Sequence, residues 1–272
     1  MTAREPESGT APAALRALAE QLATEAAGFV RRRREEVFAG APQGDGAVRT
    51  KSSPTDPVTV VDTETERLLR ERLAELRPDD AILGEEEGGT ARAPAGVPVW
   101  VLDPIDGTVN FLYGHPQWCV SIACEGVAGV VYDPLRDELF AGAPGRPTTL
   151  NGAPVDPSTC GVLSSALVAT GFGYDATQRG VQGELVARVL PRCRDIRRDG
   201  SAALDLAWTA AGRMDAYYEH GVKRWDIAAG TILCEGAGLT VRPLRARDGL
   251  PDGVLAAPPA IADELLALVD QP

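Results

Sequence analysis

The chain has 272 residues, with 27 basic and 39 acidic side chains and a formal net charge of -12. Proteins that bind a nucleic-acid backbone or an anionic membrane need a basic surface, so this charge argues against both kinds of partner. The two histidines disfavour a His-rich zinc site and a phosphohistidine mechanism. Composition leaves open which of the 39 acids hold a metal ion or move protons.

The cysteines and the apolar runs indicate where the protein works. Five cysteines without any Cys-x-x-Cys spacing are typical of reduced thiols rather than of a disulfide framework. No apolar run approaches the roughly 20 residues that span a bilayer. The polar start of the chain also lacks the apolar core of a signal peptide. We therefore expect a cytoplasmic protein that binds neither membrane nor nucleic acid.

The first elements follow from local patterns. Residues 1–12 are polar with Pro and Gly, and we expect a disordered tail. Apolar residues at helical spacing predict a long amphipathic helix over 13–38. The β-branched run 58–61 predicts a short extended piece. Thr63 and Glu66 then have the spacing of a capping box for a second helix.

The rest of the chain mixes strands and helices. Strands are predicted at 81–84, 99–102, 119–124, 129–132, 167–169, 214–218 and 254–256, and helices at 184–190, 202–211, 227–236 and 261–269. Because the two types do not alternate strictly, we expect α/β or α+β layers. The turn-rich stretch 142–160 suggests a boundary between an N-terminal α+β subdomain over 13–153 and a C-terminal α/β subdomain over 154–272.

One acidic segment, WVLDPIDGTVNF at 100–111, is the most informative. Its apolar strand ends at Asp103, and a proline turn brings Asp106 nearby. Gly107 permits a close backbone approach. Thr108 would begin a helix, where free N–H groups favour an anion. Two carboxylates beside a helix start suit a metal-bridged phosphate, although Asp-Pro and Asp-Gly are also ordinary turn formers.

Three further segments place acids at strand ends or helix starts: GEEE at 84–87, WDIAAG at 225–230 and KSSPTDPVTVVD at 51–62. Oxygen ligands without His or Cys point to Mg²⁺ rather than zinc. Paired magnesium ions are a known device for phosphoryl transfer to water, and this chain offers the separate carboxylates they need. Asp226 also begins a helix, where a carboxylate is favourable for structural reasons alone.

Together these segments resemble the signatures of the inositol monophosphatase family, which are magnesium-dependent, lithium-sensitive sugar phosphatases. The segments stand in the family's order, and the likeness runs from about residue 13 to the C-terminus. TGFGYD at 170–175, DIRRDGSAALDL at 195–206 and DAYYEHGVKRWD at 215–226 are most similar to the bacterial inositol-1-monophosphatases of the SuhB type. The resemblance implies a layered αβαβα sandwich and a homodimer.

The resemblance also implies the metal-binding and catalytic residues. Two to three magnesium ions would be held by Glu85, Asp103, the Ile105 carbonyl, Asp106 and Asp226. The catalytic step would use Asp56, Thr108 and Glu85. Of these, Asp56 and Thr108 would polarise the attacking water, and Glu85 would lie beside the weaker third ion.

The substrate contacts implied by the resemblance come from both halves of the chain. Phosphate would meet the amides of Gly107 and Thr108. The substrate's hydroxyl groups would contact Asp106, Gly200, Ser201, Ala202, Glu219 and Asp226. Lys51 and Glu86 would support the metal sites.

The expected reaction is hydrolysis of myo-inositol monophosphate, a small phosphorylated polyol, by metal-activated water. Histidinol phosphate, fructose-1,6-bisphosphate and adenosine 3′,5′-bisphosphate are alternative substrates for the same chemistry. A regulatory binding protein with incidental phosphatase activity is a further alternative. Lys223 and Arg224 either favour a second anionic group on the substrate or form a solvated turn, and we favour the turn.

Overall fold

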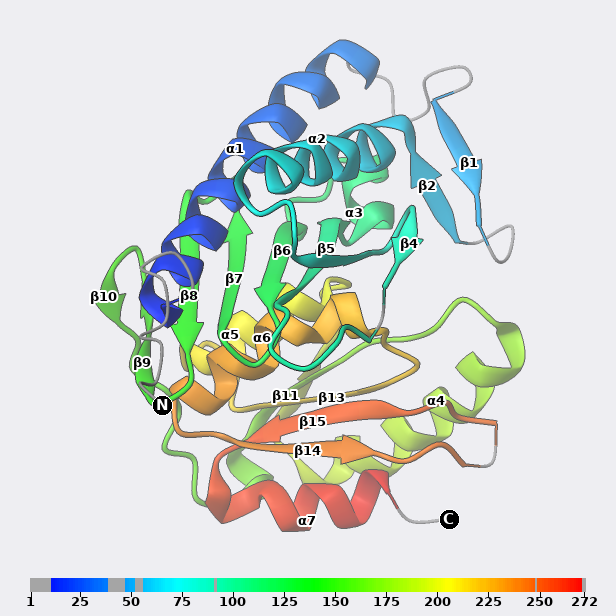
Figure 1. Ribbon diagram of the computed structural model, residues 1–272. Coiled ribbons are helices and arrows are strands. Elements are labelled where there is room, and N and C mark those ends of the chain that lie inside the picture. The colour runs from blue at the N-terminus through cyan, green and yellow to red at the C-terminus, as the bar shows by residue number, and fades with distance from the viewer. Residues whose placement is uncertain (1–10, 39–46, 52–55, 91, 248, 271–272) are drawn as a thin grey trace.

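The structure is a computed structural model that describes residues 11–38, 47–51, 56–90, 92–247 and 249–270. Of the tail predicted over 1–12, residues 1–10 lie outside the described part of the chain. Helices and sheets alternate in αβαβα order (Figure 1), which confirms the predicted layered sandwich. The helical layers, from one outer face to the other, are α1 (Pro12–Phe38) with α2 (Val60–Leu76), α5 (Ala202–Ala210) with α6 (Arg224–Gly236), and α4 (Ala176–Val189) with α7 (Pro259–Val269).

The larger sheet lies between the first two helical layers. Within the described residues it has eight strands in the order β10-β9-β8-β7-β6-β5-β3-β4. Their bounds are β3 Ala81–Gly84, β4 Gly88–Gly89, β5 Val99–Asp106, β6 Cys119–Cys124, β7 Ala128–Asp133, β8 Glu138–Ala143, β9 Arg146–Leu150 and β10 Ala153–Pro154. Only β3 and β5 pair in parallel among these neighbours.

Strand β5 shows why this sheet forms where it does. Trp100 and Leu102 pack under α1 and α2, whereas Val99 and Val101 face the core around α5 and α6. Side chains alternate between the faces of a strand, and here helices cover both faces. The strand is therefore buried along its whole length, and its apolar run carries the acids at its end into the interior.

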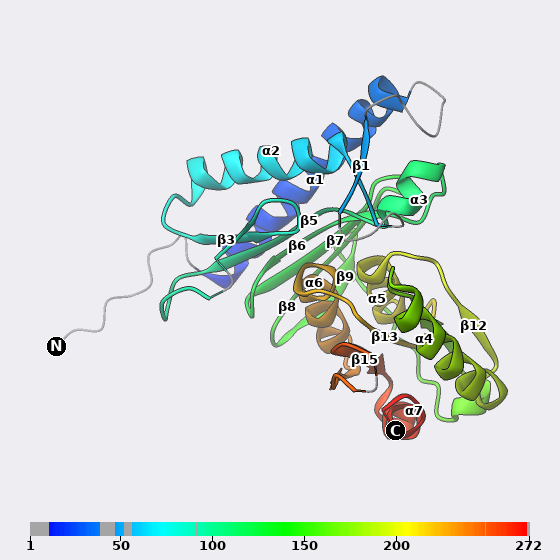
Figure 2. The same ribbon diagram turned by 90° about the vertical axis from the view of Figure 1, so that its right-hand side faces the viewer.

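The smaller sheet has five strands among the described residues, in the order β12-β11-β13-β15-β14. Their bounds are β11 Leu167–Thr170, β12 Asp195–Arg197, β13 Ala216–His220, β14 Thr240–Leu244 and β15 Gly253–Ala257. Strand β11 pairs in parallel with both β12 and β13, and the remaining pairs are antiparallel. The view turned about the vertical axis shows α5 and α6 between the two sheets (Figure 2).

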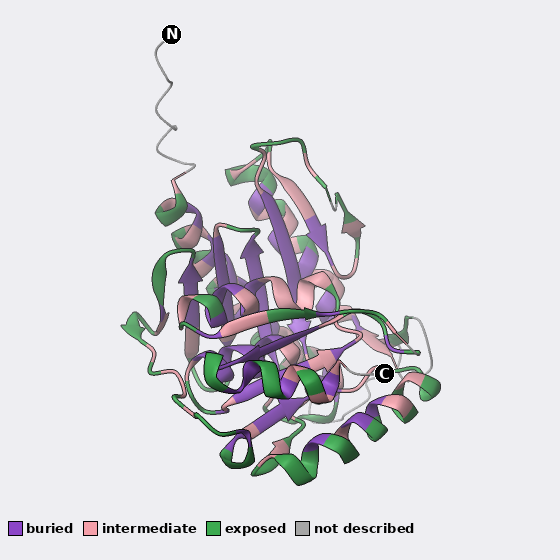
Figure 3. Ribbon diagram, turned by 90° about the horizontal axis from the view of Figure 1, so that it is seen from below, coloured by how far each residue is buried: buried purple, intermediate pink, exposed green. Residues whose placement is uncertain are grey.

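The remaining elements are short. Strands β1 (Val48–Thr50) and β2 (Pro57–Thr59) form a separate antiparallel pair, and α3 (Thr108–Tyr113) follows β5. Two 3-10 turns cover Leu163–Ser165 and Leu190–Arg192. Buried residues predominate in the central strands of the two larger sheets, whereas many exposed residues lie on helices (Figure 3). In the described part of the chain, no helix has the length and apolarity needed to cross a membrane.

The predicted start of the second helix is wrong. Helix α2 begins at Val60, and its N-cap is Thr59, so the β-branched run is helical from Val60 onward. The capping box consists of Thr59 and Asp62, not of Thr63 and Glu66. The hydroxyl of a threonine that caps free N–H groups stabilises a helix start more than β-branching disfavours it.

Strand β5 is longer than predicted, because it continues through Pro104 to Asp106 with a register shift against β6. Strands β1, β4, β8, β9, β10, β12 and β14 were not anticipated, whereas every predicted strand and helix exists, most of them with shifted ends. We propose that 13–153 and 154–272 are subdomains. The core cluster between the sheets draws on both, from Val101 on β5 to Leu233 on α6.

Candidate active site

The acidic segments meet in one cavity of about 450 Å³. It lies where the ends of β3, β5 and β13 meet the starts of α3, α5 and α6. Most predicted site residues line it, namely Lys51, Asp56, Glu85, Asp103, Ile105, Asp106, Gly107, Thr108, Gly200, Ala202, Glu219 and Asp226. The other two predicted residues, Ser201 and Glu86, lie behind this lining and contact residues of it.

Three aspartates lie close together in the lining of the cavity. One carboxylate oxygen from each of Asp103, Asp106 and Asp226 lies within 4.8 Å of the others. Burial, reinforced by the neighbouring carboxylates, raises the pKa of Asp103 and of Asp226 well above the usual range. Burial also raises the pKa of Asp106 to about 6. Three largely buried anions with oxygen donors fit a divalent cation, which would neutralise the charge that the protein leaves uncompensated.

Asp106 is tied to the start of α5. Its Oδ2 accepts hydrogen bonds from the Ser201 hydroxyl and from the Ala203 N–H, each at 2.6 Å. Ser201 is the N-cap of α5, so Asp106 contacts the residue that caps the start of this helix. The two halves of the chain approach closely here: a Cβ on Gly107 would lie 3.2 Å from the Ser201 side chain, and also 2.9 Å from the Gln117 carbonyl oxygen of its own half. Gly107 also has φ 97°, a left-handed conformation that favours glycine.

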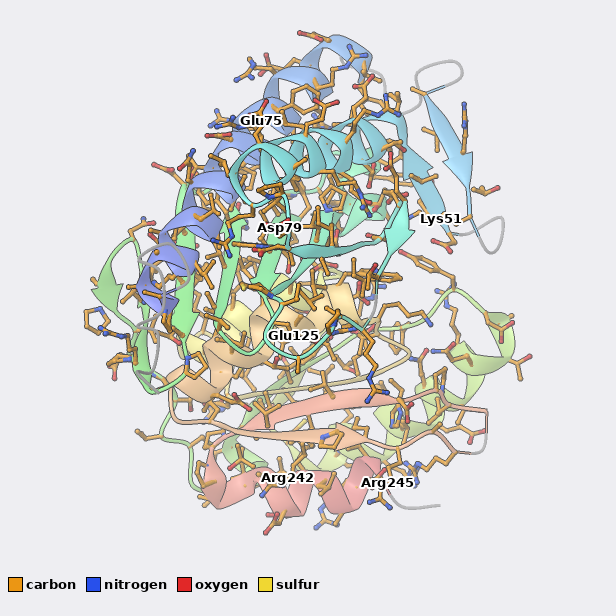
Figure 4. All side chains as sticks on the ribbon, in the orientation of Figure 1. Lys51, Glu75, Asp79, Glu125, Arg242 and Arg245 are labelled. Carbon is orange, nitrogen blue, oxygen red and sulfur yellow. The ribbon has the colours of Figure 1, made fainter. Side chains whose placement is uncertain are left out.

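Glu85 and its neighbours lie at the end of β3. Lys51 Nζ donates to Glu85 Oε1 and to Glu86 Oε1, both at 2.7 Å, and Figure 4 shows Lys51 beside β4. Burial opposes the charge on Lys51, but the two carboxylates outweigh it and raise its pKa. Burial raises the pKa of Glu86 to about 8. Lys51 thus neutralises part of the charge on this side of the cavity.

Glu66 orients this loop, a role that the sequence analysis missed. Its fully buried carboxylate accepts the N–H groups of Glu86 at 2.7 Å and Glu87 at 3.0 Å. Arg70, one turn later on α2, pairs with it at 2.8 Å. A Cβ on Gly84 would lie 2.2 Å from Glu66 Oε1, so the glycine makes room for the carboxylate. The sequence shows the helical spacing of Glu66 and Arg70, but it does not show that Glu66 contacts the loop at Glu86 and Glu87.

Asp62 is the second residue that the sequence analysis left without a role at the site. The Thr108 hydroxyl lies 3.1 Å from Asp62 Oδ1 and 3.1 Å from the Ile105 carbonyl oxygen. Asp62 is fully buried, and Thr59 donates to its other oxygen through both N–H and hydroxyl. Burial raises the pKa of Asp62 to about 6. The Thr59-x-x-Asp62 spacing is the signal that could have identified this residue.

The predicted partner of Thr108 in polarising water was Asp56. Asp56 lines the cavity, as does Thr108. The carboxylate within hydrogen-bond distance of the Thr108 hydroxyl is nevertheless that of Asp62. The role of Asp56 stays a prediction.

Glu219 enters the cavity from β13. The Tyr217 hydroxyl donates to Glu219 Oε2 at 2.7 Å. Burial raises the pKa of Glu219 to about 7, although this hydrogen bond acts in the opposite direction. Phe172, Tyr174 and Arg198 complete this wall, and the Arg198 guanidinium lies 5.7 Å from the centre of the Phe172 ring.

Lys223 and Arg224 have different surroundings, and both are at least partly exposed to solvent, as the favoured turn requires. Arg224 Nε donates to Glu125 Oε1 at 2.6 Å and thereby joins the start of α6 to the β6–β7 turn, where Figure 4 labels Glu125. Lys223 lines the cavity. Its N–H donates to Asp226 Oδ2 at 2.5 Å, so Asp226 caps α6 as well as facing the other aspartates.

Comparisons with known proteins agree with this arrangement. The sequence matches a family model described as the inositol monophosphatase family over residues 12–271. It is 55% identical over 277 residues to inositol-1-monophosphatase SuhB of Mycobacterium tuberculosis H37Rv, covering 96% of this chain and 94% of the relative. It is 36% identical over 230 residues to Nus factor SuhB of Escherichia coli K12, covering 82% and 86%. The solved structure of Mycobacterium tuberculosis SuhB aligns with a TM-score of 0.80 at 47% identity, covering 96% of this chain and 97% of that one.

Proposed function

Because the chain belongs to the inositol monophosphatase family, we propose that it hydrolyses myo-inositol monophosphate to inositol and phosphate with the help of Mg²⁺. The chain is an enzyme, a phosphatase of this family. The observation that carries the proposal furthest is the cluster of Asp103, Asp106 and Asp226, whose oxygens lie within 4.8 Å of one another at the wall of the cavity. The names of the mycobacterial relatives support inositol monophosphate as the substrate.

The proposed metal ligands are all oxygen donors. Two to three Mg²⁺ ions would be held by Glu85, Asp103, the Ile105 carbonyl, Asp106 and Asp226. Bound magnesium supplies Lewis acidity, which stabilises developing charge and lowers the pKa of water. Burial, together with the neighbouring carboxylates, raises the pKa values of the three aspartates, and a bound cation would stabilise their ionised forms, which supports this proposal.

The chain's own groups orient the phosphate and the attacking water. The amides of Gly107 and Thr108 would donate to phosphate oxygens. With its hydrogen directed to Asp62 Oδ1, the Thr108 oxygen is free to accept a proton from water. Asp62 then receives the Thr108 proton, and its pKa of about 6 suits a base at neutral pH. We infer that Asp62 acts through Thr108 in this way, with Asp56 as a further contact of the water.

The substrate's alcohol would face the other side of the cavity. Glu219 and Asp226 offer carboxylate oxygens to its hydroxyl groups, and Gly200, Ser201 and Ala202 offer the start of α5. Bonds to these two carboxylates would favour a polyol over an apolar alcohol, because an apolar group would leave both acceptors unpaired. The acidic lining thus supports a sugar-like or inositol-like leaving group.

A substrate panel tests the proposal. We expect the highest kcat/KM for myo-inositol 1-phosphate among a set that includes histidinol phosphate, fructose-1,6-bisphosphate and adenosine 3′,5′-bisphosphate. A matched reaction with EDTA checks the metal requirement. If another ester is preferred at least tenfold, the proposed substrate is wrong while the chemistry stands.

Further properties belong to the same proposal. We expect a cytoplasmic homodimer, inhibited by Li⁺, and light scattering with a lithium titration would check the last two. A regulatory binding role is a second candidate, because the Escherichia coli relative at 36% identity is named a Nus factor. An antibody pull-down from the source cells, with Asp103→Asn as a phosphatase-dead control, would separate binding from catalysis.

A further inference from the structure

Tyr217 is a buried tyrosine that the proposed reaction does not use. Its side chain is 0% exposed in the core between the sheets, yet its hydroxyl reaches Glu219 Oε2 at 2.7 Å. Residues two positions apart on a strand point to the same face, so β13 itself brings the two side chains together. Tyr218, between them, packs into the opposite core against α7.

Gly171 holds the Glu219 carboxylate from another side. It directly follows β11, the strand that pairs with β13. A Cβ on Gly171 would lie 1.9 Å from Glu219 Oε2 and 2.4 Å from Oε1. The carboxylate therefore lies against the backbone at Gly171 and cannot turn that way. Both residues line the cavity, so Glu219 presents a fixed acceptor to whatever binds there.

The hydrogen bond also has a fixed direction. Burial raises the pKa of Tyr217 well above its usual range, so the hydroxyl stays protonated and donates. A donor beside Glu219 favours its ionised form, which counteracts the effect of burial on its pKa. In this hydrogen bond the Tyr217 hydroxyl is therefore the donor and Glu219 Oε2 the acceptor.

We propose that Tyr217 is a positioning residue for substrate choice: it holds the Glu219 carboxylate in the orientation that accepts a hydrogen bond from a hydroxyl group on the substrate's alcohol. The ligand class is a phosphate ester of a polyol with a free hydroxyl near the ester. An aryl phosphate without hydroxyl groups gains nothing from this arrangement. The inference rests on the proposed function, in which Glu219 contacts the substrate.

The test compares two substrates in two matched variants. Tyr217→Phe removes the hydroxyl that reaches Glu219, and Tyr218→Phe removes the neighbouring hydroxyl on the opposite face. Both are assayed at saturating Mg²⁺ on myo-inositol 1-phosphate and on p-nitrophenyl phosphate. For Tyr217→Phe we expect KM for the inositol ester to rise about tenfold with little change in kcat, as for the loss of a hydrogen bond to a charged group. The aryl ester should change less than about twofold, and Tyr218→Phe should leave the ratio of the two substrates unchanged.

A double-mutant cycle separates positioning from folding. If Tyr217 acts through Glu219, Tyr217→Phe has no further effect on KM in a Glu219→Ala background. Equal losses on both substrates, or additive losses in the cycle, overturn the inference. A wild-type enzyme without preference for the inositol ester contradicts the proposed function and the inference with it. A wild-type preference that survives Tyr217→Phe contradicts the inference alone.

Discussion

Asp62→Asn is the substitution that most sharply separates the two candidate bases. The carbonyl oxygen of the introduced amide can still accept the N–H and hydroxyl of Thr59, which keeps the cap of α2. The amide nitrogen would then donate to Thr108, whose hydroxyl turns to the Ile105 carbonyl oxygen at 3.1 Å. The Thr108 oxygen thereby loses its route for passing on a proton. Since general base catalysis contributes about 10²- to 10⁴-fold, we expect kcat to fall by that factor.

The fold should survive this substitution. The pKa of Asp62 is raised from 3.8 to about 6 by burial, so its ionised form costs about 3 kcal/mol of stability, fully present above pH 6 and absent below pH 4. Asparagine carries no such cost at any pH. The melting temperature at pH 7 should therefore stay within a few degrees of the wild type or rise.

The matched control is Asp56→Asn, because Asp56 lines the same cavity. Phosphate release at saturating Mg²⁺ and myo-inositol 1-phosphate gives kcat for both variants. We expect Asp56→Asn to retain at least about a tenth of the wild-type kcat, since Thr108 keeps Asp62 as its proton acceptor in that variant. Asp62 is not the base that Thr108 serves if Asp62→Asn stays that active, or if Asp56→Asn falls as far as Asp62→Asn.

Three further predictions concern pH, a buried acid and a glycine. Activity should fall as the pH drops through about 6, because the base must be deprotonated and burial raises the pKa of Asp62 to about 6. The residual activity of Asp62→Asn should not show this fall at acidic pH. Identical pH profiles for the two proteins would count against Asp62 as the base. Asp205 is buried on α5, burial raises its pKa, and its oxygens have no hydrogen-bond partner among the described residues. An acid whose pKa is raised in the folded state destabilises the protein once the pH exceeds its pKa in the unfolded chain. The free energy of unfolding of Asp205→Asn should therefore be about 1–3 kcal/mol higher than that of the wild type at pH 8, with a smaller gain at pH 5. Thermal unfolding that shows no gain at pH 8 would contradict this. Gly107→Ala should lose about 1–3 kcal/mol and most of the phosphatase activity, because φ is 97° and its Cβ would lie 2.9 Å from the Gln117 carbonyl oxygen; an unchanged melting temperature would be inconsistent with that strain.

The aspartate cluster could be predicted because its residues stand at the end of an apolar strand or at the start of a helix, and both are patterns that a sequence shows locally. Asp103 follows an apolar run that is buried on both faces, and Asp226 stands at the start of a helix. A chain has few such positions. Carboxylates at several of them therefore predict, even before the fold is known, that these side chains meet in one site. The aspartate cluster meets that expectation in geometry, whereas the metal that it holds remains a proposal.

The contacts behind the site could not be predicted in the same way. Glu66 accepts N–H groups 20 and 21 residues away, and Arg224 pairs with a glutamate 99 residues away. Such pairings depend on how the layers pack, and one sequence contains no signal for them. Asp62 was missed for a different reason. Its capping box with Thr59 is local, but the β-branched run 58–61 was interpreted as extended and led to the wrong helix start.

Calorimetric titration of Mg²⁺ into the wild type and into Asp103→Asn measures directly whether the aspartate cluster holds a cation. Asp103 is 1% exposed and belongs to the aspartate cluster, so it should be indispensable to a cation bound there. We predict saturable Mg²⁺ binding by the wild type and at least about tenfold weaker binding by the variant, as for the loss of a charged ligand. Identical isotherms for the two proteins, or no binding by a folded wild type, would contradict the account.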